Sequence, residues 1–158
     1  MKIFFTALIV ALAAFAAGVW YTREYAPAPE PVPQNTPTTT PAIPQATYQN
    51  ADADMIVVTT PKPGANATST FMVTGQARGG WYFEASFPLE VRSATGTVLV
   101  QMPVQSQGDW MTANFVPFTT QVKLPAGYKG TATLILRNDN PSGLPENDAS
   151  ISIPTTIQ

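Results

Sequence analysis

The stretch WYFEASFPLEVR, from Trp81 to Arg92, carries apolar residues at every second position. One face of this alternation holds Phe83, Ala85, Phe87, Leu89 and Val91, and the other holds Tyr82, Glu84, Ser86, Pro88, Glu90 and Arg92. A two-residue period is typical of a strand with one face in a core and the other in water. Pro88 has no N–H to give to a sheet, so it favours an edge strand or a bulge. The stretch predicts a β-rich domain.

Short apolar alternations separated by turn-forming residues continue along the chain from Met55 onward. The predicted strands are Met55–Thr60, Phe71–Ala77, Tyr82–Arg92, Thr97–Val104, Met111–Phe115, Thr119–Leu124, Thr131–Arg137 and Ser150–Ile157. About seven or eight strands without a helical stretch indicate an all-β, two-sheet sandwich. Its predicted core consists of Val73, Phe83, Ala85, Phe87, Leu89, Val98, Val100, Val122, Leu134, Leu136, Ile151 and Ile153.

The composition excludes several classes of chemistry. The 158 residues contain no histidine and no cysteine, so disulfides, thiolate metal sites and catalysis by His or Cys are ruled out. The net charge of −2 and the pI near 4.9 give no electrostatic basis for binding nucleic acid. We expect no cofactor and no enzymatic activity.

Residues 1–25 are predicted to be an N-terminal membrane anchor or signal sequence. An uncharged apolar run from Ile3 to Trp20 follows Lys2, and eighteen helical residues would extend roughly 27 Å, close to the thickness of a hydrocarbon core. Trp20 and Tyr21 suit a membrane interface, which favours an uncleaved anchor. Lys2 and the amino terminus precede the run, and this bias puts the N-terminus in the cytoplasm and the rest of the chain outside. A small-x-small site at Ala14–Ala16 leaves cleavage and secretion as the alternative.

Residues 26–54 are predicted to be a disordered linker. Seven prolines lie among Thr, Ala, Gln and Asn: Pro27, Pro29, Pro31, Pro33, Pro37, Pro41 and Pro44. Such a composition buries too little apolar surface to offset its ordering entropy, and it favours polyproline II. At about 3.1 Å per residue the linker could reach at most roughly 90 Å. The folded domain is then expected to span residues 55–158.

An ordered series of motifs from Met55 to the C-terminus resembles a known family. The series contains Ile56-Val57-Val58, Pro61 to Ala65, Val73 to Gly79, Trp81 to Pro88, Gly108 to Thr112, Phe115 to Phe118, Asn140 to Glu146 and Ile153-Pro154. It looks like the immunoglobulin-like domain family of bacterial spore-germination proteins. The resemblance implies an immunoglobulin-like β-sandwich on an exported bacterial protein, and it supplies no catalytic residues.

Few residues offer candidate chemistry. Glu84 and Glu90 lie six apart on the predicted strand and therefore roughly 20 Å from each other, too far for a glycosidase pair. The loop 138–148 is rich in oxygen donors, so calcium binding is conceivable, but its spacing does not match an EF-hand and its residues are those of tight turns. Ser142 has no histidine to activate it.

Three aromatic residues are the candidate contacts for a ligand or partner: Trp81, Tyr82 and Trp110. They could form a platform for glycan or peptide, although aromatic side chains of sandwiches more often pack in the core or at a sheet edge. We therefore expect a noncatalytic interaction or structural module that is tethered to the bacterial membrane and faces the periplasm or cell wall, with an unknown envelope protein or wall glycan as its partner. The alternative is a carbohydrate-binding module that recognises wall glycan.

Overall fold

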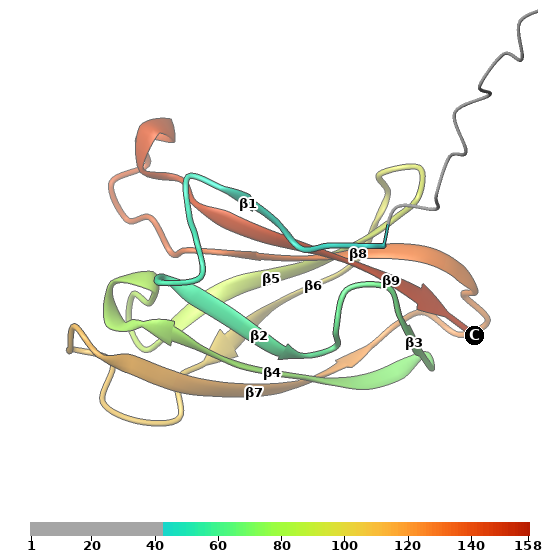
Figure 1. Ribbon diagram of the computed structural model, residues 1–158, viewed down its shortest axis with the longest axis horizontal. Coiled ribbons are helices and arrows are strands. Elements are labelled where there is room, and N and C mark those ends of the chain that lie inside the picture. The colour runs from blue at the N-terminus through green and yellow to red at the C-terminus, as the bar shows by residue number, and fades with distance from the viewer. Residues whose placement is uncertain (1–42) are drawn as a thin grey trace, which may run out of the picture. The chain divides into compact units, whose positions relative to one another are not determined.

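The structure, a computed structural model, describes residues 43–158, which form two β-sheets packed face to face (Figure 1). The larger sheet has the order β1 (Thr47–Gln49), β9 (Ser150–Ile157), β8 (Gly130–Arg137), β5 (Ser86–Ser93) and β6 (Val98–Gln105), and β3 (Ala65–Ala67) also pairs with β9. The smaller sheet has the order β2 (Ile56–Thr60), β4 (Thr70–Arg78) and β7 (Phe115–Lys123). The two-sheet β-sandwich predicted from the sequence is confirmed.

Two single 3-10 turns, η1 (Gly79–Trp81) and η2 (Pro145–Asn147), are the helical elements of residues 43–158. No helix in this part of the chain is long and apolar enough to span a membrane. The predicted anchor, and the linker up to residue 42, lie outside the described residues.

The core lies between the two sheets and is built around aromatic rings in contact with one another. Phe87 of β5 meets Phe118 of β7 edge to face, with ring centroids 5.2 Å apart, and meets Tyr82 at 5.1 Å. Edge-to-face pairs add to the free energy gained by burial. Eight of the predicted core residues are buried as expected: Val73, Phe87, Leu89, Val122, Leu134, Leu136, Ile151 and Ile153.

The predicted strand Tyr82–Arg92 is wrong over its first four residues. The strand begins only at Ser86, because Glu84 (φ 49°) and Ala85 (φ 62°) adopt left-handed backbone conformations that close a turn between Phe83 and Ser86. Before this turn, the residues predicted to face the core and those predicted to face water exchange places. Phe83, predicted to be in the core, is 40% exposed, whereas Tyr82, predicted to face water, is 3% exposed.

Further core and strand predictions need correction. Ala85 and Val100 are only half-buried, and Val98 is 45% exposed, since it starts β6 beside the exposed hairpin turn. The predicted strand at residues 111–115 is a loop up to residue 114. Met111 N donates to Asp109 Oδ1 at 3.0 Å and Asn114 N donates to Thr112 Oγ1 at 3.2 Å, and these bonds shape its backbone. Strand β7 starts at Phe115 and includes the predicted strand at residues 119–124 except Leu124.

Residues 47–49, which the sequence analysis assigned to the linker, form strand β1. This strand pairs antiparallel with β9 through Thr47↔Ser152, Tyr48↔Ile151 and Gln49↔Ser150. Tyr48 and Ala46 also pack against the core. The folded domain therefore begins before Met55.

Removing β1 is expected to destabilise the domain. A chain beginning at Met55 should unfold at a lower temperature than one beginning at Ile43, with a loss on the order of 1–3 kcal/mol, the range for burying one large side chain. Thermal unfolding followed by far-UV circular dichroism measures the difference. Equal unfolding temperatures would show that β1 is a dispensable addition to the sheet.

Pro88 and Pro103 face each other across strands β5 and β6. Neither residue has an N–H, so the pair occupies a position of the antiparallel ladder that needs no donor. Pairing of β5 with β8 begins one residue later, at Leu89↔Leu136. The expectation of an edge strand or a bulge at Pro88 is therefore wrong, because β5 lies between β6 and β8. The missing N–H is tolerated since Pro88 has no partner residue on β8.

The two ends of the sandwich differ in what they carry. Both described ends of the chain lie beside β3: Pro44 packs over Gly64, and Gln158 N donates to Ala67 O at 2.9 Å. Four connections gather at the opposite end, at residues 50–55, 79–85, 106–114 and 138–149 (Figure 1). We call these four segments the loop end.

Candidate interaction surface at the loop end

Backbone and side-chain hydrogen bonds join the four segments of the loop end to one another. Gly79 N donates to Asn114 O at 3.2 Å, and Asp139 N donates to Trp81 O at 2.9 Å. Asn50 Nδ2 donates to Asp148 O at 2.9 Å. Segments far apart in the sequence therefore present one continuous surface.

The loop 138–149 is held by its own asparagine and serine side chains. Asn138 Oδ1 accepts from Ala149 N at 2.7 Å while its Nδ2 donates to Asn147 O at 2.9 Å. Asn140 Nδ2 donates to Leu144 O at 2.9 Å and to Asp148 Oδ1 at 2.8 Å, and Ser142 Oγ donates to Asn140 Oδ1. The oxygen-rich composition thus builds an ordered turn. Within residues 43–158, no three His, Cys, Asp or Glu side chains meet closely enough to hold a metal ion.

The three aromatic candidates do not form an open platform. Trp81 is 4% exposed and Tyr82 is 3% exposed, and both belong to the core. Trp110 is half-buried and packs against that core. The indole Nε1 of Trp81 is buried and has no acceptor among the described residues.

Tyr82 places its hydroxyl group in the interior, where it donates to Val116 O at 2.9 Å. Burial raises the pKa of Tyr82 to about 12. The phenolate form of Tyr82 is disfavoured because ionisation would put a charge in an apolar site. It would also remove the O–H group that donates the hydrogen bond to Val116 O.

This raised pKa predicts a loss of stability at alkaline pH. The unfolded tyrosine ionises near pH 10 and the folded one near pH 12, so the contribution of Tyr82 is complete below pH 10 and falls between pH 10 and 12. Burial and the nearby Asp52 also raise the pKa of Tyr48, which acts in the same direction. In urea titrations, Tyr82→Phe should therefore lose less stability than wild type over this pH interval. Parallel pH profiles for the two proteins would contradict the assignment.

Arg78 joins two segments of the loop end. Its Nε donates to Asp54 O at 2.9 Å and its Nη1 donates to Ala113 O at 3.1 Å. Its guanidinium carbon also lies 4.2 Å from the centroid of the Phe115 ring, within the range of a cation–π contact. The charge of Arg78 is therefore held in a fixed position.

A cavity of about 310 Å³ opens at this end of the sandwich. Its walls come from three of the loop-end segments and from Arg78, and the lining residues are Asn50, Met55, Arg78, Gly80, Trp81, Asn138, Asn147 and Ala149. Met55 is 42% exposed although its side chain is apolar. Of the residues singled out from the sequence for ligand contact, only Trp81 lines this cavity. The oxygen-rich loop 138–148, which the sequence also singled out, supplies two more wall residues, Asn138 and Asn147.

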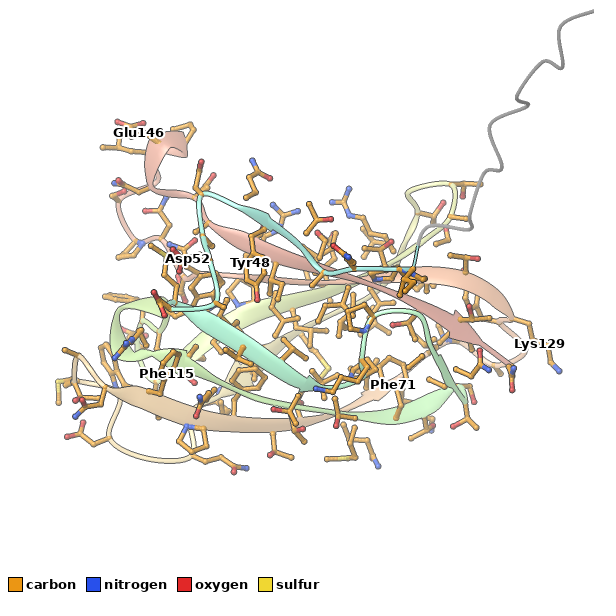
Figure 2. The ribbon with its side chains drawn as sticks, in the orientation of Figure 1. Tyr48, Asp52, Phe71, Phe115, Lys129 and Glu146 are labelled. Atoms are coloured by element: carbon orange, nitrogen blue, oxygen red, sulfur yellow. The ribbon has the colours of Figure 1, made fainter. Side chains whose placement is uncertain are left out.

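The charges of the domain are divided between its two ends. Seven carboxylates belong to the loop end: Asp52, Asp54, Glu84, Asp109, Asp139, Glu146 and Asp148. Among residues 43–158, the cations at or beside these segments are Arg78 and Arg137. Lys62, Lys123 and Lys129 lie at the opposite end, whose loops 61–64, 68–69, 94–97 and 124–129 contain no acid. Figure 2 shows Asp52 and Glu146 at one end and Lys129 at the other.

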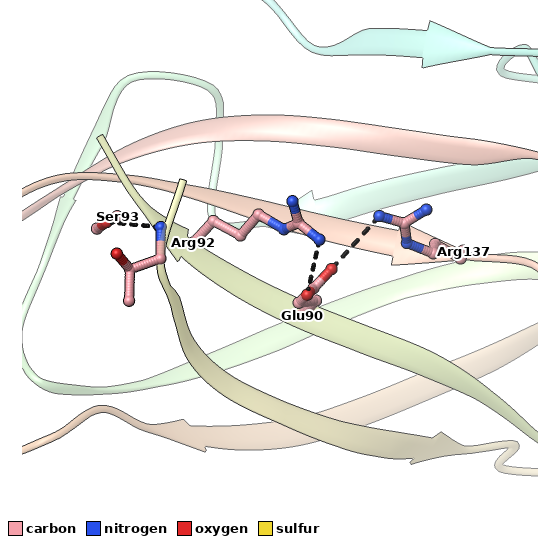
Figure 3. Close-up of polar contacts among 5 residues, drawn as sticks. Glu90, Arg92, Ser93 and Arg137 are labelled. Carbon is pink, nitrogen blue, oxygen red and sulfur yellow. Dashed lines mark hydrogen bonds and ion pairs between the residues drawn. The ribbon is translucent and has the colours of Figure 1, made fainter. Parts of the chain in front are cut away.

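The remaining candidate acid, Glu90, lies in the middle of β5 and has a structural environment. Glu90 is only 8% exposed. Its Oε1 accepts a hydrogen bond from Arg92 Nη2 at 3.0 Å, and its Oε2 accepts one from Arg137 Nη2 at 3.4 Å (Figure 3). The alternation of residues 81–92 predicted Glu84 and Glu90 on the water-facing side of one strand. That placement is wrong, because Glu84 lies in the turn before the strand and Glu90 is covered by two arginines.

Comparison with known proteins identifies the family but no individual relative. The family described as "Immunoglobulin-like domain of bacterial spore germination" matches residues 55–144, more than half of the 158 residues. Comparison with the curated proteins found no match. The match extends from the residue before β2 into the loop 138–149, so it covers the strands that form most of both sheets. The chain belongs to the family of immunoglobulin-like domains of bacterial spore germination.

Proposed function

We propose that this protein is a noncatalytic interaction module, held at the outer face of the bacterial cytoplasmic membrane by its N-terminal segment. The observation that carries the proposal is the arrangement of the domain. The chain enters beside β3, and the four segments of the loop end lie at the other end of the sandwich (Figure 1). A domain tethered through residues before Ile43 can therefore offer the loop end to a partner without hindrance from its own tether.

Membership of the immunoglobulin-like family supports a binding role, since sandwiches of this kind commonly place recognition in the loops at one end. The residue inventory supports a noncatalytic role. The chain lacks both the side chain most used for acid–base catalysis at neutral pH and the most reactive thiol nucleophile.

Cell fractionation and protease treatment test the location. The full chain should remain with the membrane fraction, and protease added to spheroplasts should digest its C-terminal domain. Cross-linking in native membranes should then capture an envelope protein. Recovery of a soluble mature form that starts near Ala17 would contradict the tether and favour secretion after signal cleavage.

Activity assays test the noncatalytic role. The purified chain should release no product from wall glycan, peptide or ester substrates, with or without calcium. Turnover that disappears in Glu84→Gln would overturn this part of the proposal, because Glu84 would then act as a catalytic acid.

A further inference from the structure

We propose that the cavity of the loop end binds a linear, basic peptide segment of a partner protein, which inserts one large apolar side chain into the cavity. This inference rests on the proposed function and names the site and the class of partner through which it would operate. Three features of the structure carry it: the lining of the cavity, its size and the charge around it.

The lining suits an apolar side chain flanked by peptide backbone. Met55, Trp81 and Ala149 supply apolar surface, and Gly80 leaves space, because a Cβ built at that position meets nothing within 4 Å. Asn50 and Asn147 lie beside this surface, and each uses its Nδ2 within the loops. Their Oδ1 atoms make no hydrogen bond among the described residues, so they can accept from the N–H groups of an extended peptide.

The size of the cavity limits what can enter. At about 310 Å³ it stands at the lower end of the range for pockets that enclose small molecules. It can hold one large side chain of a peptide, whereas the rest of that peptide would lie along the surrounding loops. An anchor side chain in a pocket with weaker contacts around it is the usual arrangement of a binding hot spot.

The charge around the cavity selects the kind of peptide. Asp54 adjoins Met55, Asp139 adjoins Asn138, and both Glu146 and Asp148 adjoin Asn147. Against the seven carboxylates of the loop end, the cation within the lining is Arg78, which is already bound to two carbonyl oxygens and stacked on Phe115. Lysine or arginine residues beside the anchor would meet complementary charge, whereas an anionic wall polymer would be repelled.

Selection from a display library of random linear peptides tests the proposal directly on the full chain, purified in mild detergent. Enriched peptides should carry one large apolar residue with basic neighbours. In fluorescence anisotropy, their affinity should fall with rising salt, because exposed charges are screened. Replacing the apolar residue of such a peptide by alanine should weaken binding by about tenfold or more. Failure to enrich any peptide, or enrichment of acidic ones, would overturn the proposal.

Two variants of the cavity have a matched control at the same end of the sandwich. Gly80→Leu fills the cavity and Met55→Lys puts a positive charge on its wall, so each should weaken peptide binding by about tenfold or more. Gly108→Leu adds the same side chain to the loop 106–114, outside the cavity and at a position whose built Cβ meets only Val116 Cγ1 at 3.8 Å. It should bind like wild type. Circular dichroism and thermal unfolding confirm that each variant is folded.

The outcomes separate this inference from the proposed function. Equal peptide binding by wild type and Gly80→Leu would overturn the cavity as the site. If oligomers of N-acetylglucosamine bound wild type but not Gly80→Leu, the ligand of the cavity would be a glycan and the peptide proposal would be overturned. If cross-linking in native membranes captures the same partner from wild type and Gly80→Leu, the interaction module stands while the cavity proposal fails.

Discussion

Replacing Phe87 by alanine is expected to lower the free energy of unfolding by about 3–5 kcal/mol, the usual cost of truncating a buried phenylalanine. Phe87 is 1% exposed and lies between the rings of Tyr82 and Phe118, so its removal leaves a cavity that both sheets border. Urea titration of the purified protein measures the loss.

The matched control for this substitution is Phe83→Ala. Phe83 and Phe87 share one side of the alternation in the sequence, but Phe83 is 40% exposed and should cost less than about 1 kcal/mol. Tyr82→Ala, which the alternation alone would make mild, should instead cost several kcal/mol because the ring is buried against Phe87. Similar losses for Phe83→Ala and Phe87→Ala would show that the turn at Glu84-Ala85 is misplaced.

The second large effect is expected at Gly79. A Cβ on this residue would overlap the backbone carbonyl oxygens of Trp110 and Thr112, neither of which can move without displacing the loop 106–114. Gly79→Ala should therefore destabilise the domain by about 1–3 kcal/mol or more, as overpacking of a well-packed interior does. Thermal unfolding monitored by circular dichroism gives the comparison.

The neighbouring glycine provides the control. A Cβ at Gly80 meets nothing within 4 Å, so Gly80→Ala should change stability by no more than about 0.5 kcal/mol. If Gly79→Ala had little effect on stability and Gly80→Ala a large one, the loop 106–114 would pack against Gly80 and not against Gly79, which would contradict the structure.

Much of the sandwich follows from the sequence because strands β5, β8 and β9 each keep one face in the core. Leu89, Leu134 and Ile153, for example, are all buried as their alternation predicts. The alternation failed upstream of Ser86, where apolar residues continue in phase through a turn. Neither Glu84 nor Ala85 is a glycine or asparagine, so nothing in the residue types reveals their positive φ values.

Strand β1 was missed for a different reason. Thr47-Tyr48-Gln49 lies in a proline-rich segment and has only three residues, so its composition resembles a linker. Its stability comes from pairing with β9, which is more than a hundred residues away along the chain. A contact of this kind has no local signature.

The candidate site was predictable in part. Trp81, which the sequence offered as a ligand contact, lines the cavity, but other parts of the wall come from Asn50, Met55 and Ala149, which no motif connects. They meet because β1, β2 and β9 all reach the same end of the sandwich. The acidic character of that end was equally hidden, since it arises from four separate loops in a chain whose net charge is only −2.

The facing pair Pro88 and Pro103 bears on how crowded copies of this protein would behave. Strand β6 is the outer strand of the larger sheet, and such strands can recruit a strand from a neighbouring molecule and seed aggregation. At Pro103 an incoming strand would find no amide to pair with, so the ladder would be interrupted near its middle. Copies that meet through the β6 edge can thus remain separate molecules instead of fusing into one extended sheet.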